Sequence, residues 1–520
     1  PAPVSLRRRP PGPPRLGRRG PRLREPLPVG LQEALARPRA ARLPCAEWWC
    51  RCGQQRGRYP YATSEDYHRS HPAVKAVAAW QRAAGRSAPE VFREASPGGY
   101  RTRGKMAVGP AAAGAPSGAA AIGLFRKGTW RVLPSDGCAS NHPLLVAAIN
   151  TLRRELEALR GVVLPFDHDA SESWLITEGA LRYVELTVER ATGRVQLVLV
   201  WNGRRGQPAP ALERLIEALW PRGAREAEAA ADGATWWHSI WVHWRDPDPA
   251  LLRAIHCKQP DAWEQVRPVD GTSEVVEELD GLAFAFGPAS FQQANLGVFE
   301  RMLADMKLAL RRWTPASEAG ATAQPLRLLE LCGGVGAIGL SLAHAAASWE
   351  DSPGAVLLST DVNPNCAGPF AANAERVFPG LATAARKAAP GVEAHFRAVS
   401  AQDALHELAP AAGAGAAAAA DVLVLDPPRR GLARNQHRLG LRGGLEEAAA
   451  IRRSSVRTIV YMSCGHESFM ADADRLTGAD PEACGSDWGP AFRLEELACY
   501  DMFPFTPHIE TLGIFTRGAA

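Results

Sequence analysis

Long apolar runs are missing from this sequence. No stretch of about 18 strongly apolar residues occurs, and the least polar stretches, 106–125 and 411–420, are mostly Ala and Gly. A helix that spans a membrane is therefore not expected. Cysteine is also sparse, because ten Cys are scattered over 520 residues. This excludes a small disulfide scaffold and indicates a reducing compartment.

Most of the chain also lacks a strong charge of one sign. Residues 1–44 contain eleven Arg against two Glu, a local net charge of +9, so the remaining residues carry −4 of the total of +5. The positive total is therefore a property of this first segment. The positive net charge is therefore no evidence that the rest of the protein is a basic enzyme that acts on nucleic acid.

The first 44 residues also contain eleven Pro and show no apolar periodicity. Such a segment buries too little apolar surface to offset its ordering entropy, so we expect it to be disordered. An Arg-rich, acid-poor N-terminus is typical of an organelle transit peptide, which would direct the protein to a plastid, such as a chloroplast, or to a mitochondrion. Without such a peptide we expect the cytoplasm. Residues 45–97 contain Cys but predict no particular fold.

The length predicts two or three domains, and 46% hydrophobic residues are enough for sizeable cores. Residues 98–285 contain stretches that alternate like strands, a β-hairpin around Gly193 and two amphipathic helices. This pattern predicts an α+β domain, in which no catalytic constellation is evident.

Residues 286–520 predict an α/β domain. Short apolar strands over 326–331, 355–361, 421–426 and 457–463 alternate with helices and end in polar or Gly-containing residues. Such an order implies a mostly parallel sheet covered on both faces, a Rossmann-like arrangement. Ligands of these sheets bind at the carboxyl ends of the strands, where the polar residues stand.

A Gly-rich turn, Gly334-x-Gly336-x-x-Gly339, follows the first of these strands. Small residues let a backbone approach a ligand at a helix N-terminus, in dinucleotide enzymes and methyltransferases alike. Asp361 ends the next strand and could accept hydrogen bonds from ribose hydroxyls. A tight turn that packs helix on strand is the alternative reading. The pattern indicates a nucleotide-like cofactor and does not choose between the two enzyme classes.

The segment DVLVLDPPRRGL carries a more specific signal. Asp426 ends a strand and is followed by Pro427 and Pro428, which restrict the backbone and fix the shape of the loop. A structural corner rarely combines a carboxylate, two Pro and two Arg. Arg429 and Arg430 could contact phosphate or solvent.

Two residues near the C-terminus are candidates for covalent catalysis. Cys464 follows the strand 457–463, where a thiolate could act as a nucleophile if its pKa were lowered. Glu510 lies within an otherwise apolar final strand, where burial could hold it as a general base. A small buried Cys and a structurally paired Glu are the alternatives.

Six motifs together resemble the RNA uracil-5-methyltransferase family, with plant and algal members the most similar. The likeness covers roughly 286–518, and it extends more weakly upstream. The motifs occur in the family's order: FQQAN (291–295), LLELCGGVGAIGL (328–340), DVNPN (361–365), DVLVLDPPRRGL (421–432), IVYMSCG (459–465) and DMFPFTPHIETLGIF (501–515).

The resemblance implies a class I methyltransferase that transfers a methyl group from S-adenosylmethionine to C5 of a uridine in tRNA or rRNA. Its mechanism would use Cys464 as the nucleophile at C6 and Glu510 as the base that removes the C5 proton. The cofactor-binding positions implied are Gln293, Cys332, Gly334, Gly336, Asp361 and Asp426. The family usually has an aromatic residue in place of Cys332, and Gly465-His466 after the nucleophile is similar to the plant form.

Many members of this family bind an iron–sulfur cluster through three closely spaced Cys and a distant one. Cys45, Cys50 and Cys52, with Cys138 as the fourth, could form a 4Fe–4S site here. Their C-x4-C-x-C spacing departs from the usual C-x5-C-x2-C. The competing interpretation is a relic of a cluster site that no longer binds a cluster, or a zinc site.

Three other functions compete with uridine methylation. A 5-methylcytosine RNA enzyme also needs a Cys nucleophile, but that class typically has a second Cys directly after a Pro, where this chain has Arg429. An NAD-dependent oxidoreductase would leave Cys464 and Glu510 without a role. A non-catalytic RNA-binding relative would not need both residues. We expect RNA as the partner, no membrane and a monomer.

Overall fold

We describe the protein from a computed structural model of the whole chain. The structure describes residues 70–93, 98–112, 114–126, 128–135, 137–168, 180–220, 237–245, 262–268, 273–314, 324–380, 391–408, 420–432, 444–483, 488–504 and 506–518. The segment 1–44, predicted to be disordered, and Cys45, Cys50 and Cys52 lie outside this part of the chain. No helix in it is long and apolar enough to cross a membrane.

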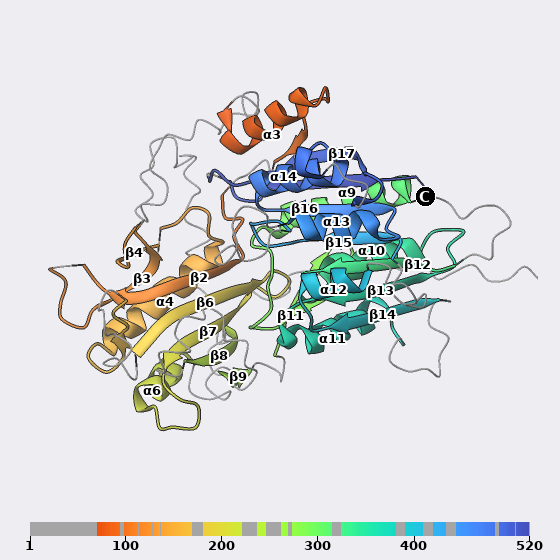
Figure 1. Cartoon of the computed structure of the whole chain (residues 1–520). Helices are drawn as coiled ribbons and strands as arrows, with labels where there is room; N and C mark the ends of the chain where they lie inside the picture. Colours follow the sequence, from red (N-terminus) through yellow and green to blue (C-terminus); the bar gives the residue numbers. More distant parts are fainter. Residues whose placement is uncertain are drawn as a thin grey trace, which may run out of the picture.

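The C-terminal half forms the predicted α/β domain (Figure 1). Its eight-stranded sheet has the order β1-β17-β18-β16-β15-β12-β13-β14, and β18 alone among these strands runs antiparallel to both neighbours. The strands are β1 Glu90–Phe92, β12 Leu326–Leu331, β13 Ala355–Thr360, β14 Val392–Arg397, β15 Val422–Leu425, β16 Thr458–Ser463, β17 Arg493–Tyr500 and β18 Glu510–Thr516.

Helices cover both faces of this sheet because its strands are apolar on both sides. Val424 and Val460 pack into one core, whereas their neighbours Leu423 and Ile459 pack into the other. The helices of the first face are α9 Leu296–Trp313, α10 Ala337–Ala347 and α11 Ala367–Val377, and those of the second are α12 Ala401–Leu408, α13 Leu445–Arg453 and α14 His466–Thr477.

Residues 70–93, for which no particular fold was predicted, belong to this same domain. Strand β1 pairs with β17 in parallel, with Val91 opposite Cys499. Helix α3, Pro72–Ala83, buries Val74 and Val77 against Cys499 and Ile509. Figure 1 shows the orange helix α3 beside the blue C-terminal elements. The first described segment therefore closes one edge of the C-terminal sheet.

The central α+β domain is also confirmed (Figure 1). Its sheet has the order β4-β3-β2-β6-β7-β8-β9, with β5 added beside β6. The predicted hairpin joins β6 and β7, and Gly193 turns at a φ of +70°. The strands are β2 Arg103–Pro110, β3 Ala120–Phe125, β4 Val132–Pro134, β5 Leu164–Pro165, β6 Ala180–Glu189, β7 Arg194–Asn202, β8 Trp237–Arg245 and β9 Trp263–Pro268.

One face of the central sheet is covered by the amphipathic helices α4, Pro143–Ala158, and α6, Pro210–Leu219, which bury their apolar sides there. The hairpin of β10, Val275–Leu279, and β11, Leu282–Phe286, follows this sheet in the chain and leads to α9. The face opposite α4 and α6 borders a cavity shared with the C-terminal domain.

Candidate active site

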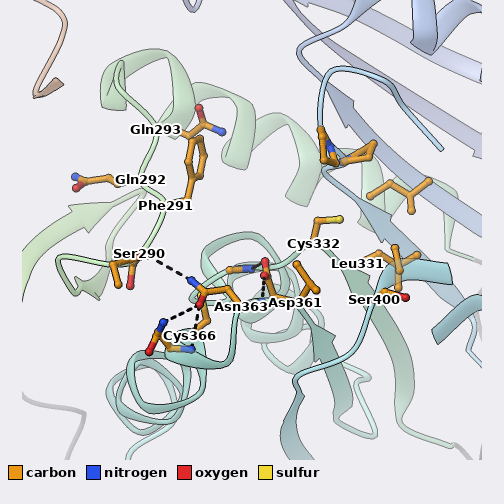
Figure 2. A pocket seen from close by; sticks show the side chains of 18 of the residues that line it. Ser290, Phe291, Gln292, Gln293, Leu331, Cys332, Asp361, Asn363, Cys366 and Ser400 are labelled. Atoms are coloured by element: carbon orange, nitrogen blue, oxygen red, sulfur yellow. Dashed lines mark hydrogen bonds between the residues drawn. The ribbon is translucent and has the colours of Figure 1, made fainter. Parts of the chain in front are cut away.

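A cavity of about 1200 Å³ lies between the central domain and the carboxyl ends of β12, β13 and β15. This is the edge of the sheet where the sequence predicted a ligand. The C-terminal domain contributes to its lining the predicted residues Gln293, Cys332, Gly334 and Asp361, together with Asn363, Cys366, Ser400, Pro427, Pro428 and Arg430. Figure 2 shows many of these side chains.

The turn after β12 has the backbone that its Gly residues allow. Gly334 and Gly336 adopt φ values of +57° and +81°, and Cys332 also has a positive φ of +60°. Asp361 fixes this turn, because its Oδ2 accepts a hydrogen bond from the Gly334 amide at 3.0 Å. Gly336 is the N-cap residue of α10, and a Cβ there would meet the ring of Phe370.

Glu330 supports the same turn from beneath and was missed by the sequence analysis. Its carboxylate accepts hydrogen bonds from the Gly339 amide at 2.7 Å and from the Ser359 hydroxyl at 2.6 Å. Burial raises its pKa to about 7. A charged residue in the middle of an apolar strand was the available signal.

The loop after β15 is held against the helix that follows Cys464. The Ser468 hydroxyl donates to the Arg429 carbonyl at 2.8 Å, and Oδ2 of Asp472 accepts the Leu432 amide at 2.8 Å. Gly465 makes this approach possible, since a Cβ there would lie 2.2 Å from the Arg429 oxygen. Ser468 and Asp472 were also missed, because they look like surface positions of a helix.

Strand pairing brings the two catalytic candidates together. Ser463 of β16 lies opposite Thr511 of β18 in an antiparallel register, and the next step of that register places Cys464 opposite Glu510. Glu510 is 2% exposed, and its Oε2 atom has no hydrogen-bond partner among the described residues. Cys464 is half-buried.

The pKa values of both groups are raised in this site. Burial, followed by the negative charge of Asp426, raises the pKa of Glu510 well above its ordinary value. Burial and then the charges of Glu510 and Asp426 raise the pKa of Cys464 to about 11, against an opposing effect of Arg429. Asp426 itself has its pKa raised to about 7 by burial and then by Asp361. A cation bound beside these acids would lower all of these pKa values.

The residues therefore fit S-adenosylmethionine. Asp361 and the Gly334 turn suit its ribose, and the acidic groups around Asp426 suit its sulfonium charge. Gln293 and Cys332 also line the cavity, from the two different segments shown in Figure 2.

The predicted metal site is not assembled in the described residues. Cys138 lies in the turn before α4, while its three expected partners fall outside the described part of the chain. No group of three or more His, Cys, Asp or Glu side chains within the described residues is placed to hold a metal ion. The iron–sulfur cluster stays a prediction.

The chain is similar to known RNA methyltransferases. No protein-family model matches the chain. An uncharacterized RNA methyltransferase of Protochlamydia amoebophila is 28% identical over 396 residues, 76% of this chain and 82% of that protein. The 23S rRNA (uracil(1939)-C(5))-methyltransferase RlmD of Chromohalobacter salexigens is 26% identical over 441 residues, 83% of this chain and 68% of that protein.

A solved structure has the same fold. The tRNA (uracil-54, C5)-methyltransferase of Pyrococcus abyssi, in complex with S-adenosyl-L-homocysteine, matches with a TM-score of 0.54 and 18% identity. The match covers 90% of this chain and 85% of that structure. The predicted class I methyltransferase fold is thereby confirmed.

Proposed function

We propose that this chain, which is homologous to RNA methyltransferases that include uracil-C5 enzymes, transfers a methyl group from S-adenosylmethionine to C5 of a uridine in RNA. The observation that carries the proposal is the convergence of Cys464, Glu510 and Asp426 beside the Gly-rich turn. A protein that only bound RNA would not need a thiol and a buried carboxyl group together at one strand junction.

The cofactor supplies an electrophilic methyl group on a positively charged sulfur. Asp361 is placed to accept hydrogen bonds from its ribose hydroxyls, and Gln293 is available on the adjacent loop. The raised pKa values of Asp426 and Glu510 show that negative charge is unfavourable in the empty site. A bound cation such as the sulfonium would stabilise the ionised form of both carboxyl groups.

For the reaction we propose a covalent route. C5 of uracil is a weak nucleophile, so the Cys464 thiolate first adds to C6 and gives C5 enolate character. After C5 has accepted the methyl group, Glu510 removes the C5 proton, the C5–C6 double bond forms again, and the thiolate leaves. Before the attack the Cys464 thiol must release its proton to solvent water, because its pKa of about 11 keeps the thiol neutral at pH 7.

The experiment is mass spectrometry of nucleosides from RNA that has been incubated with the protein and methyl-labelled cofactor. Separate samples of tRNA and rRNA show which class is the substrate. Label in 5-methyluridine supports the proposal. Label in 5-methylcytidine, or in no nucleoside of either RNA, overturns it.

We also propose an organelle destination, plastid or mitochondrion, from the composition of residues 1–44 alone. Imaging of the full chain fused at its C-terminus to a fluorescent protein tests this, because deletion of residues 1–44 should then return the fusion to the cytoplasm.

A further inference from the structure

The loop that leads to Glu510 is held in place by a part of the chain that is distant in sequence. This loop, residues 501–509, joins β17 to β18, and the two strands pair from Tyr500 and Glu510 onward. Its conformation therefore sets the position of Glu510, whose carboxyl group must reach a single proton of the substrate. The segment that contacts the loop is 70–93, the first part of the chain that the structure describes.

His71 is fully buried and links α3 to this loop. As the N-cap residue of α3, it accepts a hydrogen bond from the Val74 amide on Nδ1, at 3.5 Å. Its Nε2 atom lies 3.1 Å from the carbonyl oxygen of Thr506. Burial lowers the pKa of His71 to about 4, so the ring is neutral at pH 7 and carries one proton. Because Nδ1 acts as an acceptor, that proton is on Nε2, which donates to Thr506.

Thr506 transmits this contact to the rest of the loop. Its hydroxyl donates to the Phe503 carbonyl at 2.8 Å and accepts a hydrogen bond from the His508 amide at 3.2 Å. His508 stands two residues before Glu510. A displacement of Thr506 would therefore move the segment that directly precedes the carboxyl group.

Strand β1 and helix α3 hold the two ends of the same loop. The Asp501 amide donates to the Phe92 carbonyl at 2.9 Å, and Nε of Arg93 forms an ion pair with Oδ2 of Asp501 at 3.7 Å. At the other end, Ile509 packs in one apolar cluster with Val74 of α3. The first described segment thus contacts the loop at its first residue, near its middle and at its last residue.

We propose that residues 70–93 hold Glu510 in the position from which it removes the C5 proton, and that His71 is the positioning residue at the centre of this contact. The inference rests on the proposed function, because it concerns the step assigned there to Glu510. His71 is not among the described residues that line the cavity, so it acts through Thr506 and not on the substrate. Loss of its contact should slow proton removal and leave the earlier steps unchanged.

A purely structural role would have a different effect. Lower stability reduces the amount of folded enzyme, so it slows all steps in the same proportion. Poor positioning of Glu510 instead delays a step that follows methyl transfer, so the methylated covalent adduct accumulates. Because methyl transfer is irreversible in practice, kcat should fall while kcat/KM for RNA stays near the parent value.

His71→Asn tests the contact with the loop and keeps the cap of the helix. Asn is a preferred N-cap residue whose Oδ1 can replace Nδ1, but its side chain is too short to reach the Thr506 carbonyl. With labelled RNA and S-adenosylmethionine, we expect kcat to fall about fivefold. The fraction of enzyme in the covalent adduct, measured by denaturing electrophoresis, should rise. Calorimetric affinity for S-adenosylmethionine should stay at the parent value, which also shows that the variant is folded.

Two further variants serve as controls. His71→Gln can donate to Thr506 from its own Nε2 but lacks the short acceptor that a cap needs, so it should lower the melting temperature without trapping adduct. Trp80→Phe removes the hydrogen bond that Nε1 of Trp80 donates to Oδ1 of Asp474 at 2.9 Å, near the C-terminal end of α3. It should also lower the melting temperature and leave the adduct at the parent level.

Three results overturn the inference. These are parent values of kcat and adduct in His71→Asn, a fall in kcat/KM without more adduct in that variant, or as much adduct in Trp80→Phe. If His71→Asn does not fold, Arg93→Gln decides in its place, because it removes the ion pair with Asp501 and should trap adduct in the same way. A parent protein that forms no 5-methyluridine refutes the proposed function and this inference together. Normal methylation without excess adduct in the variant refutes this inference alone.

Discussion

At the scale of single residues, Cys464 and Glu510 have separate tasks that can be told apart. Both lie at one strand junction, and burial raises the pKa of each. In the proposed mechanism the thiol forms the bond to C6, whereas the carboxylate is needed only after the methyl group has moved. Loss of the first should stop the reaction before a covalent bond forms, and loss of the second should stop it afterwards.

We therefore expect Glu510→Gln to accumulate a protein–RNA adduct and Cys464→Ala to form none. Glutamine keeps the shape of the side chain but cannot accept the C5 proton, so the methylated intermediate is trapped. Denaturing electrophoresis with labelled RNA and S-adenosylmethionine measures the adduct. Cys499→Ala is the control, because this thiol is fully buried beside α3 and should leave adduct formation and turnover unchanged.

Two results would refute this assignment of roles. If Cys464→Ala retained activity near that of the parent, the reaction would not be covalent and Cys464 would be a small packing residue. If Glu510→Gln turned over normally without an adduct, another group would be the base.

The raised pKa of Cys464 predicts how the free protein reacts with an alkylating agent. The thiolate is the reactive form, so modification by iodoacetamide should rise by about tenfold per pH unit from pH 7 toward pH 10. After burial, Glu510 is the largest cause of the raised pKa. Glu510→Gln should therefore lower the pKa and speed modification at a given pH, as measured by mass spectrometry of the peptide that contains Cys464.

Glu467→Gln is the control for this prediction. Glu467 lies three residues beyond Cys464 in the first turn of α14, but its side chain is exposed and its charge is not among the causes of the thiol's raised pKa. Its removal should leave the pH profile unchanged. A profile that levels off near pH 8 in the parent protein would contradict the assigned pKa.

At the scale of elements, helix α14 sets the position of the loop that carries Asp426. Oδ2 of Asp472 accepts hydrogen bonds from the Tyr461 hydroxyl at 2.7 Å and from the Leu432 amide at 2.8 Å. Tyr461 belongs to β16, which also carries Cys464 at its end. One buried carboxylate thus ties a strand, a helix and the loop together behind the reacting groups.

Asp472→Asn should reduce both stability and turnover. An amide oxygen is a weaker acceptor than a carboxylate and cannot serve both donors as well, so the free energy of unfolding should fall by about 1–3 kcal/mol. The loosened loop should lower kcat, because Asp426 and Cys464 would no longer be held in a fixed relation. Urea unfolding and steady-state kinetics measure the two effects.

Tyr461→Phe separates stability from positioning. It removes the hydroxyl but keeps the hydrogen bond from Leu432 to Asp472, so it should cost about 1 kcal/mol and leave kcat near the parent value. An equal loss of kcat in both variants would show that reduced stability, and not the position of the loop, limits the activity.

Sequence patterns predicted the elements that depend on local signals. The apolar runs of β12, β13, β15 and β16 are continuous because both faces of a parallel sheet are buried, so they could be recognised without long-range information. Strand β1 could not be recognised in this way, since it has three residues and its partner β17 lies about 400 residues further along the chain. Pairing between short strands that are distant in sequence produces no hydrophobic periodicity from which it could be predicted.

The same reasoning explains which site residues were found. Cys464, Glu510, Asp361 and Asp426 stand at strand ends, where polar residues are unexpected unless they bind something. Lys105, in contrast, alternates with apolar residues along β2 and resembles an ordinary solvent-facing position. Only the docking of the two domains shows that this face lines the cavity.

At the scale of the whole molecule, the central domain also holds the loop of Gln293, which lines the cavity. Nη1 and Nη2 of Arg103 donate to the carbonyls of Ser290 and Pro288, at 2.5 and 3.2 Å. The Thr102 amide donates to the Ala294 carbonyl at 2.9 Å. These contacts hold both ends of the segment that carries Gln293 against β2. The central domain therefore positions the loop of Gln293, a proposed cofactor-binding residue that belongs to the C-terminal domain.

This coupling predicts that Arg103→Gln weakens S-adenosylmethionine binding in the absence of RNA, by roughly fivefold to tenfold, because the loop of Gln293 loses its anchor. Lys105→Gln provides a close comparison. Lys105 lies two residues further along β2, lines the same cavity and loses the same charge, yet it makes no hydrogen bond to this loop among the described contacts. Calorimetry should show weakened cofactor binding for Arg103→Gln alone. If both variants bound the cofactor as the parent does, the loop of Gln293 would keep its position without the Arg103 hydrogen bonds.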